Sequence, residues 1–167
     1  MGRDKAFVEV HGVAMVRRVA DALVDAGCHP VAAVGGDPTR LAGVGLDVVP
    51  DDHPGDGPIG AIITALRWRC PVLVVACDLP LLGPDDVGLL LSSVEVEGPV
   101  DVVVATTDHL EPLCAIWMPS ALEPLVAAFG DGERAAHRVI ATLRARRVPM
   151  PAERFLNVNA PGDLPTS

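Results

Sequence analysis

Acidic side chains follow two apolar runs of the sequence, at the points where buried strands are expected to end. Asp78 comes directly after residues 72–77, six apolar residues without alternation, and Asp51 follows residues 46–49. Pro80 stiffens the chain just beyond Asp78. A carboxylate fixed at the end of a rigid strand can hold Mg²⁺ together with the phosphate oxygens of a substrate. The alternatives are that Asp78 caps a turn or the next helix, and that Asp51 belongs to an ordinary polar loop.

Two glycine-rich loops also follow expected strands. Gly35 and Gly36 come after the apolar residues 31–34, and residues 55–60 read Gly-Asp-Gly-Pro-Ile-Gly. Glycine lets the backbone approach a ligand closely, which makes both loops candidates for binding an anionic ligand. Neither loop continues into Gly-Lys-Ser or Gly-Lys-Thr, so neither is a phosphate loop of the Walker type.

Five further polar residues are candidates for binding or acid–base chemistry. Lys5 is the sole lysine beside twelve arginines, and its compact charge suits a phosphate in a tight space. The alternative is a solvated lysine near a terminus. Asn157 and Asn159 alternate in an extended segment, so both amides can meet one ligand or metal, unless they bond to loop backbone. His53 and His109 lack a Ser or Cys partner in a recognisable elbow, which argues against a nucleophilic hydrolase.

Helix and strand patterns alternate along the chain, which predicts one three-layer α/β domain over residues 1–167. The mostly parallel sheet has an antiparallel excursion across the short link 106–111, and the run 72–77 is expected at its centre, buried on both faces. Ligands of such sheets gather at the carboxyl ends of the strands, where the candidate residues fall. The expected helices are 15–26, 59–69, 84–92, 120–129 and 133–146, and the expected strands are 31–34, 46–49, 72–77, 100–105 and 112–117.

Composition narrows the range of functions. The net charge is −9, aromatic residues make up 3%, and the largest basic cluster is 144–147, which together argue against nucleic-acid binding. The four cysteines form no Cys-x-x-Cys pair, and three lie in or beside apolar runs, so we expect small buried thiols in a reducing compartment. No apolar stretch reaches about 20 residues and no leader precedes the body, which predicts a cytoplasmic protein without a membrane contact.

Five ordered landmarks, taken together, resemble the nucleotidyltransferases that make molybdenum-cofactor dinucleotides. The first resembles the end of that family's Leu-Ala-Gly-Gly-x-Ser-x-Arg-Met-Gly-x-Asp-Lys-Ala signature. The ending favours the guanylyltransferases among them. The landmarks are Met-Gly-Arg-Asp-Lys-Ala at 1–6, Pro-Asp-Asp to Gly-Pro-Ile-Gly at 50–60, Cys-Asp-Leu-Pro-Leu-Leu at 77–82, Glu-Pro-Leu-Cys-Ala-Ile-Trp at 111–117 and Phe-Leu-Asn-Val-Asn-Ala-Pro-Gly-Asp-Leu at 155–164.

The resemblance implies a Rossmann-like nucleotidyltransferase fold and the transfer of GMP from GTP to the phosphate of molybdopterin, with release of pyrophosphate and use of Mg²⁺. It implies transient contact with other cofactor-synthesis proteins. The alternatives are a molybdopterin cytidylyltransferase, a 2-phospholactate guanylyltransferase, or a relative that binds a nucleotide without catalysis. Carried over residue by residue, the resemblance implies that Lys5 and Asp78 are catalytic and that the metal is held by Asp78 and Asn159. It implies that Asn157 and Asn159 bind the pterin side. The residues implied to bind the nucleotide are Lys5, Asp78, Gly2, Arg3, Gly36 and Asp51.

The sequence departs from the family pattern at two places. Gly36 stands where the family often has asparagine, so it can offer only its backbone. The family also has a strand and the Leu-Ala-Gly-Gly-x-Ser loop ahead of the position of Met1. We therefore expect either a start codon assigned at an internal methionine or a truncated chain, with a degenerate nucleotide-binding protein as the third possibility. Without that strand, the sheet is expected to have a gap with two exposed edges.

Overall fold

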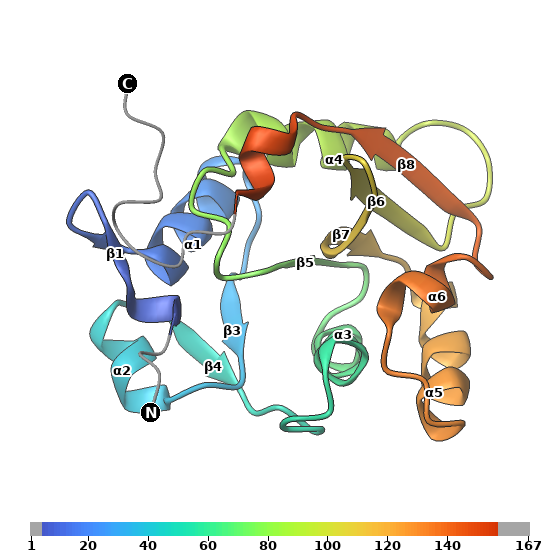
Figure 1. The fold of residues 1–167 in the computed structure, drawn as a ribbon, viewed down its shortest axis with the longest axis horizontal. Helices are drawn as coiled ribbons and strands as arrows, with labels where there is room; N and C mark the ends of the chain where they lie inside the picture. The colour runs from blue at the N-terminus through green and yellow to red at the C-terminus, as the bar shows by residue number, and fades with distance from the viewer. Residues whose placement is uncertain (1–4, 157–167) are drawn as a thin grey trace.

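The computed structural model describes residues 5–156, in which helices and strands alternate around two main sheets (Figure 1). The helices are α1 (Met15–Asp25), α2 (Pro38–Gly43), α3 (Pro58–Trp68), α4 (Pro84–Val94), α5 (Leu122–Gly130) and α6 (Ala136–Ile140). The strands are β1 (Glu9–Val10), β2 (Val13–Ala14), β3 (Ala32–Val34), β4 (Asp47–Val49), β5 (Val72–Val75), β6 (Val102–Thr106), β7 (Leu110–Trp117) and β8 (Ala145–Pro149). Short 3₁₀ turns are η1 (Lys5–Phe7), η2 (Pro119–Ala121) and η3 (Ala152–Phe155).

The larger sheet has the order β5-β7-β6-β8 and carries most of the core. β7 is antiparallel to both β5 and β6, and β6 is parallel to β8, so the expected antiparallel excursion is present. A separate pair, β3 and β4, is parallel, and β1 and β2 form a small hairpin. The α/β class is confirmed, with sheets that are mixed in direction.

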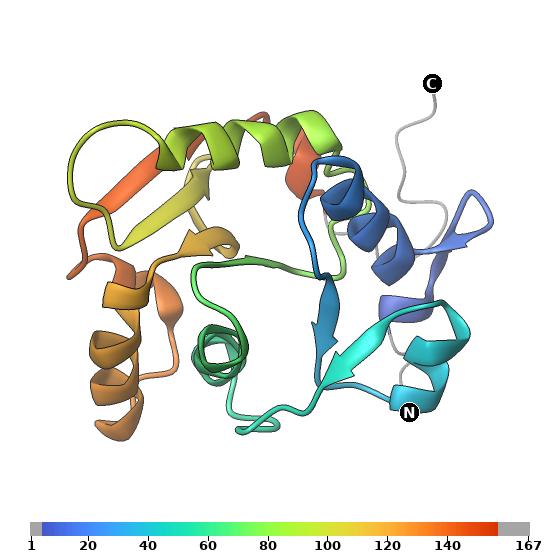
Figure 2. The same ribbon diagram turned by 180° about the vertical axis from the view of Figure 1, so that it is seen from behind.

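Helices cover both faces of the larger sheet, which gives the expected three layers. One face packs against α3, α5 and α6, with Trp117 fully buried between them. The other face packs against α1 and α4, which lie side by side in both views (Figures 1 and 2). None of the helices in the described part of the chain combines the length and apolar character needed to cross a membrane.

The helix α1 serves two hydrophobic clusters at once. Val19 and Leu23 pack with the larger sheet, whereas Val16 and Ala20 pack with the unit formed by α2, β3 and β4. These positions recur at three and four residues, the spacing that predicted the helix from sequence. Gly27, with φ of +88°, follows the end of the helix in the left-handed conformation that favours glycine.

The prediction of one helix over residues 133–146 is confirmed only for α6, Ala136–Ile140. Helix α6 ends at Ile140, and Ala145 already belongs to β8. The cause is Asp101, a carboxylate 6% exposed at the start of β6. Its Oδ2 accepts hydrogen bonds from the backbone N of Arg144 (2.9 Å) and from Nε of Arg144 (2.8 Å). These bonds hold the pKa of Asp101 well below its usual range and hold the chain extended alongside β6.

Besides β8, the β1–β2 hairpin and α2 were not predicted from the sequence. Helix α2 had a recognisable start, because Asp37 accepts hydrogen bonds from the backbone N of Thr39 (2.9 Å) and Arg40 (3.1 Å), and Pro38 occupies the first helical turn. An Asp-Pro pair is a common beginning of a helix. Only a tight loop was expected there.

The expected central position of β5 is wrong for the described part of the chain. β5 is half-buried and lies at the edge of its sheet, with β7 as its one strand partner there. The N–H of Ala76 bonds to the carbonyl of Leu113 in the direction of β7. Backbone N–H and C=O groups point to opposite sides at successive residues of a strand, so those of Leu73 and Val75 point away from β7. By the same reasoning, the bond from Gly35 N to Val49 O turns the backbone of Val34 away from β4.

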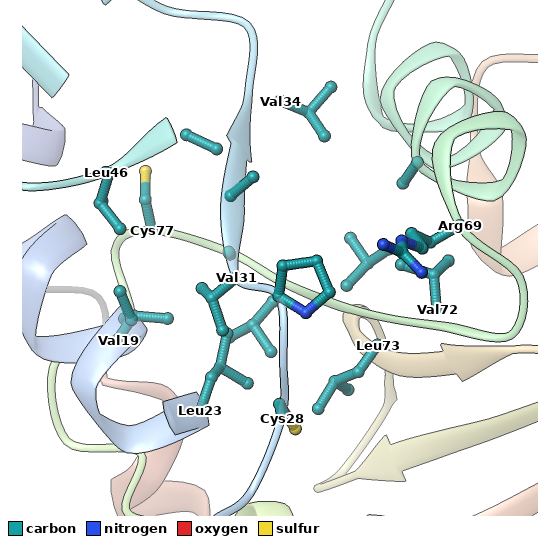
Figure 3. Close-up of a pocket in the computed structure, with 18 of the residues that line it drawn as sticks. Val19, Leu23, Cys28, Val31, Val34, Leu46, Arg69, Val72, Leu73 and Cys77 are labelled. Atoms are coloured by element: carbon teal, nitrogen blue, oxygen red, sulfur yellow. The ribbon is translucent and has the colours of Figure 1, made fainter. Parts of the chain in front are cut away.

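A cleft of about 820 Å³ separates these two strand edges. It lies between β3 and β5, and its walls are largely apolar side chains from α1, α3 and the strands. In Figure 3, Leu23, Val31 and Leu73 converge on it from α1, from the residue before β3 and from β5. The interrupted sheet therefore matches the gap that the resemblance implied.

The prediction of three buried cysteines is confirmed only for Cys114. All four are thiols, but only Cys114 is buried, whereas Cys28 is half-buried and Cys70 and Cys77 are exposed. The two exposed thiols flank β5, whose outer edge opens onto the cleft. Burial, with the nearby charges of Glu111 and Asp86, raises the pKa of Cys114 to about 12, so this thiol stays protonated.

Candidate functional site

Asp51 lies directly after β4, and its carboxylate is held by its surroundings. Its Oδ1 accepts a hydrogen bond from the backbone N of His53 (2.9 Å) and lies 3.1 Å from Oγ1 of Thr64 in α3. The side chain is half-buried. A carboxylate fixed in this way presents an acceptor in a defined direction, unlike the side chain of an ordinary polar loop.

The turn formed by Gly35 and Gly36 lies opposite Asp51. A Cβ placed on Gly35 would be 3.3 Å from Cβ and 3.8 Å from Oδ2 of Asp51. Both glycines have positive φ, +69° and +89°, a conformation that L side chains rarely adopt. The structure therefore places Gly35, the neighbour of the predicted nucleotide-binding position Gly36, against Asp51 at the carboxyl ends of two parallel strands.

The loop between Asp51 and α3 is packed closely against the helix it precedes. A Cβ on Gly60 would lie 2.7 Å from Cβ and 3.3 Å from the carbonyl O of His53. On its other side the His53 ring contacts Phe129 of α5, with ring centroids 4.6 Å apart, and Arg134 lies over the same Phe129 ring. The close approach at Gly60 thus fixes the position of His53 and, through its backbone, of Asp51.

We expect Gly60→Ala to destabilise the protein by about 1–3 kcal/mol, because the added methyl group overlaps backbone and Cβ atoms of His53 that have little room to move. The matched control is Gly88→Ala in α4, where a Cβ would meet nothing within 4 Å. That change is expected to stabilise by about 0.5–1 kcal/mol, because alanine favours the helix more than glycine does. Urea unfolding of both variants measures the two opposite signs; equal shifts would contradict the close packing at Gly60.

Asp78 lies after β5 in a loop held by groups from other elements. Nε of Arg18 in α1 donates to the carbonyl of Pro80 (3.3 Å), and Arg154 donates to the carbonyl of Leu81 (3.4 Å). The side chain at the start of α4 that accepts the capping bond is Asp86, from the N–H of Gly83 (2.9 Å). Within the described residues the half-buried Asp78 carboxylate makes no hydrogen bond, so the capping alternative is not what the structure shows.

Lys5 is exposed in η1, directly before two residues that line the cleft. Its neighbours Ala6 and Phe7 line the cleft together with Gly36 and with Cys77, the residue before Asp78. Most of the lining is apolar, with His29 and Arg69 as its basic side chains, and the charges of a triphosphate need donors or a cation. Further polar groups lie at the rim, meaning the residues next to the lining: Lys5 precedes Ala6, Asp78 follows Cys77, and Asp51 lies against Gly35.

Gly2, Arg3, Asn157 and Asn159 lie outside the described residues. His109 lies in the link between β6 and β7 and contacts Glu111 at 3.2 Å. Sequence reasoning missed Thr64, whose signal was a hydroxyl on a helix whose other buried positions are apolar.

A carboxylate oxygen of the kind that Asp78 offers fits Mg²⁺. This ion prefers hard oxygen ligands, and it uses one or two carboxylates and completes its shell with phosphate oxygens and water. Within residues 5–156 there is no group of three or more His, Cys, Asp or Glu side chains that could hold a metal by themselves.

Residues 1–148 match the family model of the MobA-like NTP transferase domain. A protein of Cereibacter sphaeroides named molybdenum cofactor guanylyltransferase is 32% identical over 169 residues, covering 98% of this chain and 86% of that protein. A protein of the same name from Shewanella sp. strain W3-18-1 is 30% identical over 170 residues, covering 96% and 84%.

Solved structures share the fold. Molybdopterin-guanine dinucleotide biosynthesis protein A from Archaeoglobus fulgidus superimposes with a TM-score of 0.77 at 23% identity, covering 98% of this chain and 90% of that one. The 2-C-methyl-D-erythritol 4-phosphate cytidylyltransferase of Thermus thermophilus superimposes with a TM-score of 0.71 at 17% identity, covering 95% and 89%. At these identities the likeness establishes the architecture, that of nucleotidyltransferases with a Rossmann-like fold.

Proposed function

The chain belongs to the MobA-like NTP transferase family, and from this we propose that it transfers GMP from GTP to the phosphate of molybdopterin. The observation that carries the proposal is the identity of 30% or more, over nearly the whole chain, to proteins named molybdenum cofactor guanylyltransferase. The rim of the cleft supports it, because a fixed acceptor at Asp51, the Gly35–Gly36 turn and Asp78 all lie at strand ends.

In the proposed reaction, a phosphate oxygen of molybdopterin attacks the α-phosphorus of GTP. The new P–O bond forms as the bond to the β-phosphate oxygen breaks, and pyrophosphate leaves with the electron pair. Such transfers need little covalent chemistry from the protein, so positioning and charge neutralisation supply the rate. Asp51 orients the nucleotide through its remaining acceptor oxygen, and the ammonium of Lys5 lies against the phosphates.

Asp78 is the residue that would hold Mg²⁺, with Asn159 contributing from outside the described part of the chain. When bound, the metal neutralises negative charge that develops on the phosphate oxygens. Asn157 and Asn159 would form the pterin side of the site. The partners of the protein are then GTP and molybdopterin, with transient contact to the proteins that supply this acceptor.

The test is a nucleotide titration with Mg²⁺ and molybdopterin, following pyrophosphate release. We expect turnover with GTP and a kcat/KM for CTP lower by about 100-fold or more, because a site built for one base leaves buried polar groups unpaired with another. Preference for CTP would assign a cytidylyltransferase. Turnover of GTP with 2-phospholactate alone would assign the other guanylyltransferase, and GTP binding without pyrophosphate release from any acceptor would assign a non-catalytic protein.

A further inference from the structure

Thr64 is a buried polar residue in a helix that is otherwise apolar at its core positions. Thr64 is 3% exposed, and its neighbours Ile63 and Leu66 in α3 are also buried. Its hydroxyl oxygen is 3.1 Å from each of three groups: Oδ1 of Asp51, the backbone N of Asp52 and the carbonyl O of Gly60. A hydroxyl has one proton to donate, so these three contacts are not equivalent.

The donors and acceptors around the hydroxyl decide where its proton goes. The backbone N–H of Asp52 can only donate, so Thr64 accepts there. The carbonyl of Gly60 is one turn earlier in the same helix and is already an acceptor of the helical ladder. The Asp51 carboxylate is charged, and a hydrogen bond to an ionised acceptor is the stronger of the two. The hydroxyl therefore donates to Oδ1 of Asp51.

This bond leaves the two oxygens of Asp51 in different roles. Oδ1 is occupied by two donors, Thr64 Oγ1 and the N–H of His53. Oδ2 lies on the side of the Gly35–Gly36 turn, where the glycine has no side chain to cover it. Among the described residues Oδ2 has no hydrogen-bond donor. One oxygen is thus an anchor, and the other is an acceptor aimed at the space beside the turn.

We propose that Thr64 is a positioning residue for nucleotide recognition: its hydroxyl holds the Asp51 carboxylate so that the second oxygen can accept an N–H or O–H group of the bound nucleotide. The proposal rests on the proposed function, since it concerns the same nucleotide site. Without the hydroxyl, the carboxylate can rotate about its side-chain torsions. The nucleotide must then order it on binding, and affinity falls.

The test is GTP affinity, measured by calorimetry, together with KM and kcat for Thr64→Val and Thr64→Ser. Valine keeps the volume and removes the hydroxyl, so we expect both Kd and KM for GTP to rise about tenfold with kcat nearly unchanged. Serine keeps the hydroxyl and is expected to restore both constants to within about twofold. A role only in stability predicts a lower melting temperature and unchanged constants.

Thr142→Val is the matched control, because the Thr142 hydroxyl bonds only to the carbonyl of Val139 (2.8 Å) in the described contacts. It should leave the GTP constants unchanged. If Thr64→Val folds poorly, Thr64→Ala removes the same hydroxyl and is expected to show the same rise. Thr64 variants that bind GTP as tightly as the wild type, while Asp51→Ala does not, overturn the proposal. A wild-type protein that binds GTP without releasing pyrophosphate overturns the proposed function instead, and leaves this binding comparison valid.

Discussion

Dinucleotide formation by Asp78→Asn is expected to fall by about 1,000-fold or more, with the fold retained. Asparagine keeps the size of the side chain and removes its charge, so it no longer serves as an anionic ligand for Mg²⁺ beside the phosphates. The fold should survive, because the half-buried carboxylate makes no hydrogen bond in the described part of the chain, and the cap of α4 comes from Asp86. Pyrophosphate release with GTP, molybdopterin and Mg²⁺ is the measurement, beside thermal unfolding.

Asp85→Asn is the control for this change, because Asp85 is exposed in the first turn of α4 in the same acidic stretch. It removes the same charge from the chain and should leave turnover within about twofold, as expected for a surface substitution. Wild-type turnover by Asp78→Asn would remove Asp78 from the catalytic machinery, and with it the assigned metal ligand.

Lys5→Ala is expected to lower kcat by about 100-fold, because one preorganised cation beside a transferring phosphoryl group contributes about that much. Lys5→Arg should recover little of the loss. Arginine is a wide planar fork, and it cannot replace a compact ammonium where space is tight. Single-turnover kinetics with saturating GTP separates this effect on the chemical step from an effect on binding.

Arg147→Ala is the matched cation control for Lys5. Arg147 is exposed in β8 and lies on a different segment from the cleft. Full activity in the Lys5→Arg protein would show that any cation suffices at this position, and would contradict the argument that lysine is chosen here for its shape.

Much of the fold could be predicted from residue spacing. The helix α1 and the strands β6 and β7 were recognisable, because each forms its pattern from its own residues. The β8 strand was not, since Ala145 becomes extended only when Arg144 meets the distant Asp101. The edge position of β5 was not predictable either, because its apolar run is the same whether the strand is paired on one edge or on both.

The candidate site was also predictable only in part from the sequence. The proximity of Asp51 to Gly35 and Gly36 was predictable, because parallel strands end at one edge of a sheet. The close approach of Gly60 to His53 was not predictable, because a pattern of residue types does not give the distance between two backbone segments. The partner of Thr64 was not predictable either, since Asp51 is thirteen residues earlier in the chain.

The position of helix α1 affects how the two sheets are coupled when the protein unfolds. Because β3 and β5 share no ladder in the described structure, no backbone hydrogen bonds carry cooperativity from one sheet to the other. The coupling passes through side chains, with Val16 and Ala20 on one side of α1 and Val19 and Leu23 on the other. The unit of α2, β3 and β4 can then unfold at lower free energy than the larger sheet, as a separate cooperative unit. Since Gly35 and Gly36 belong to that unit, local unfolding there would take apart one wall of the nucleotide site while the core around Trp117 stays intact.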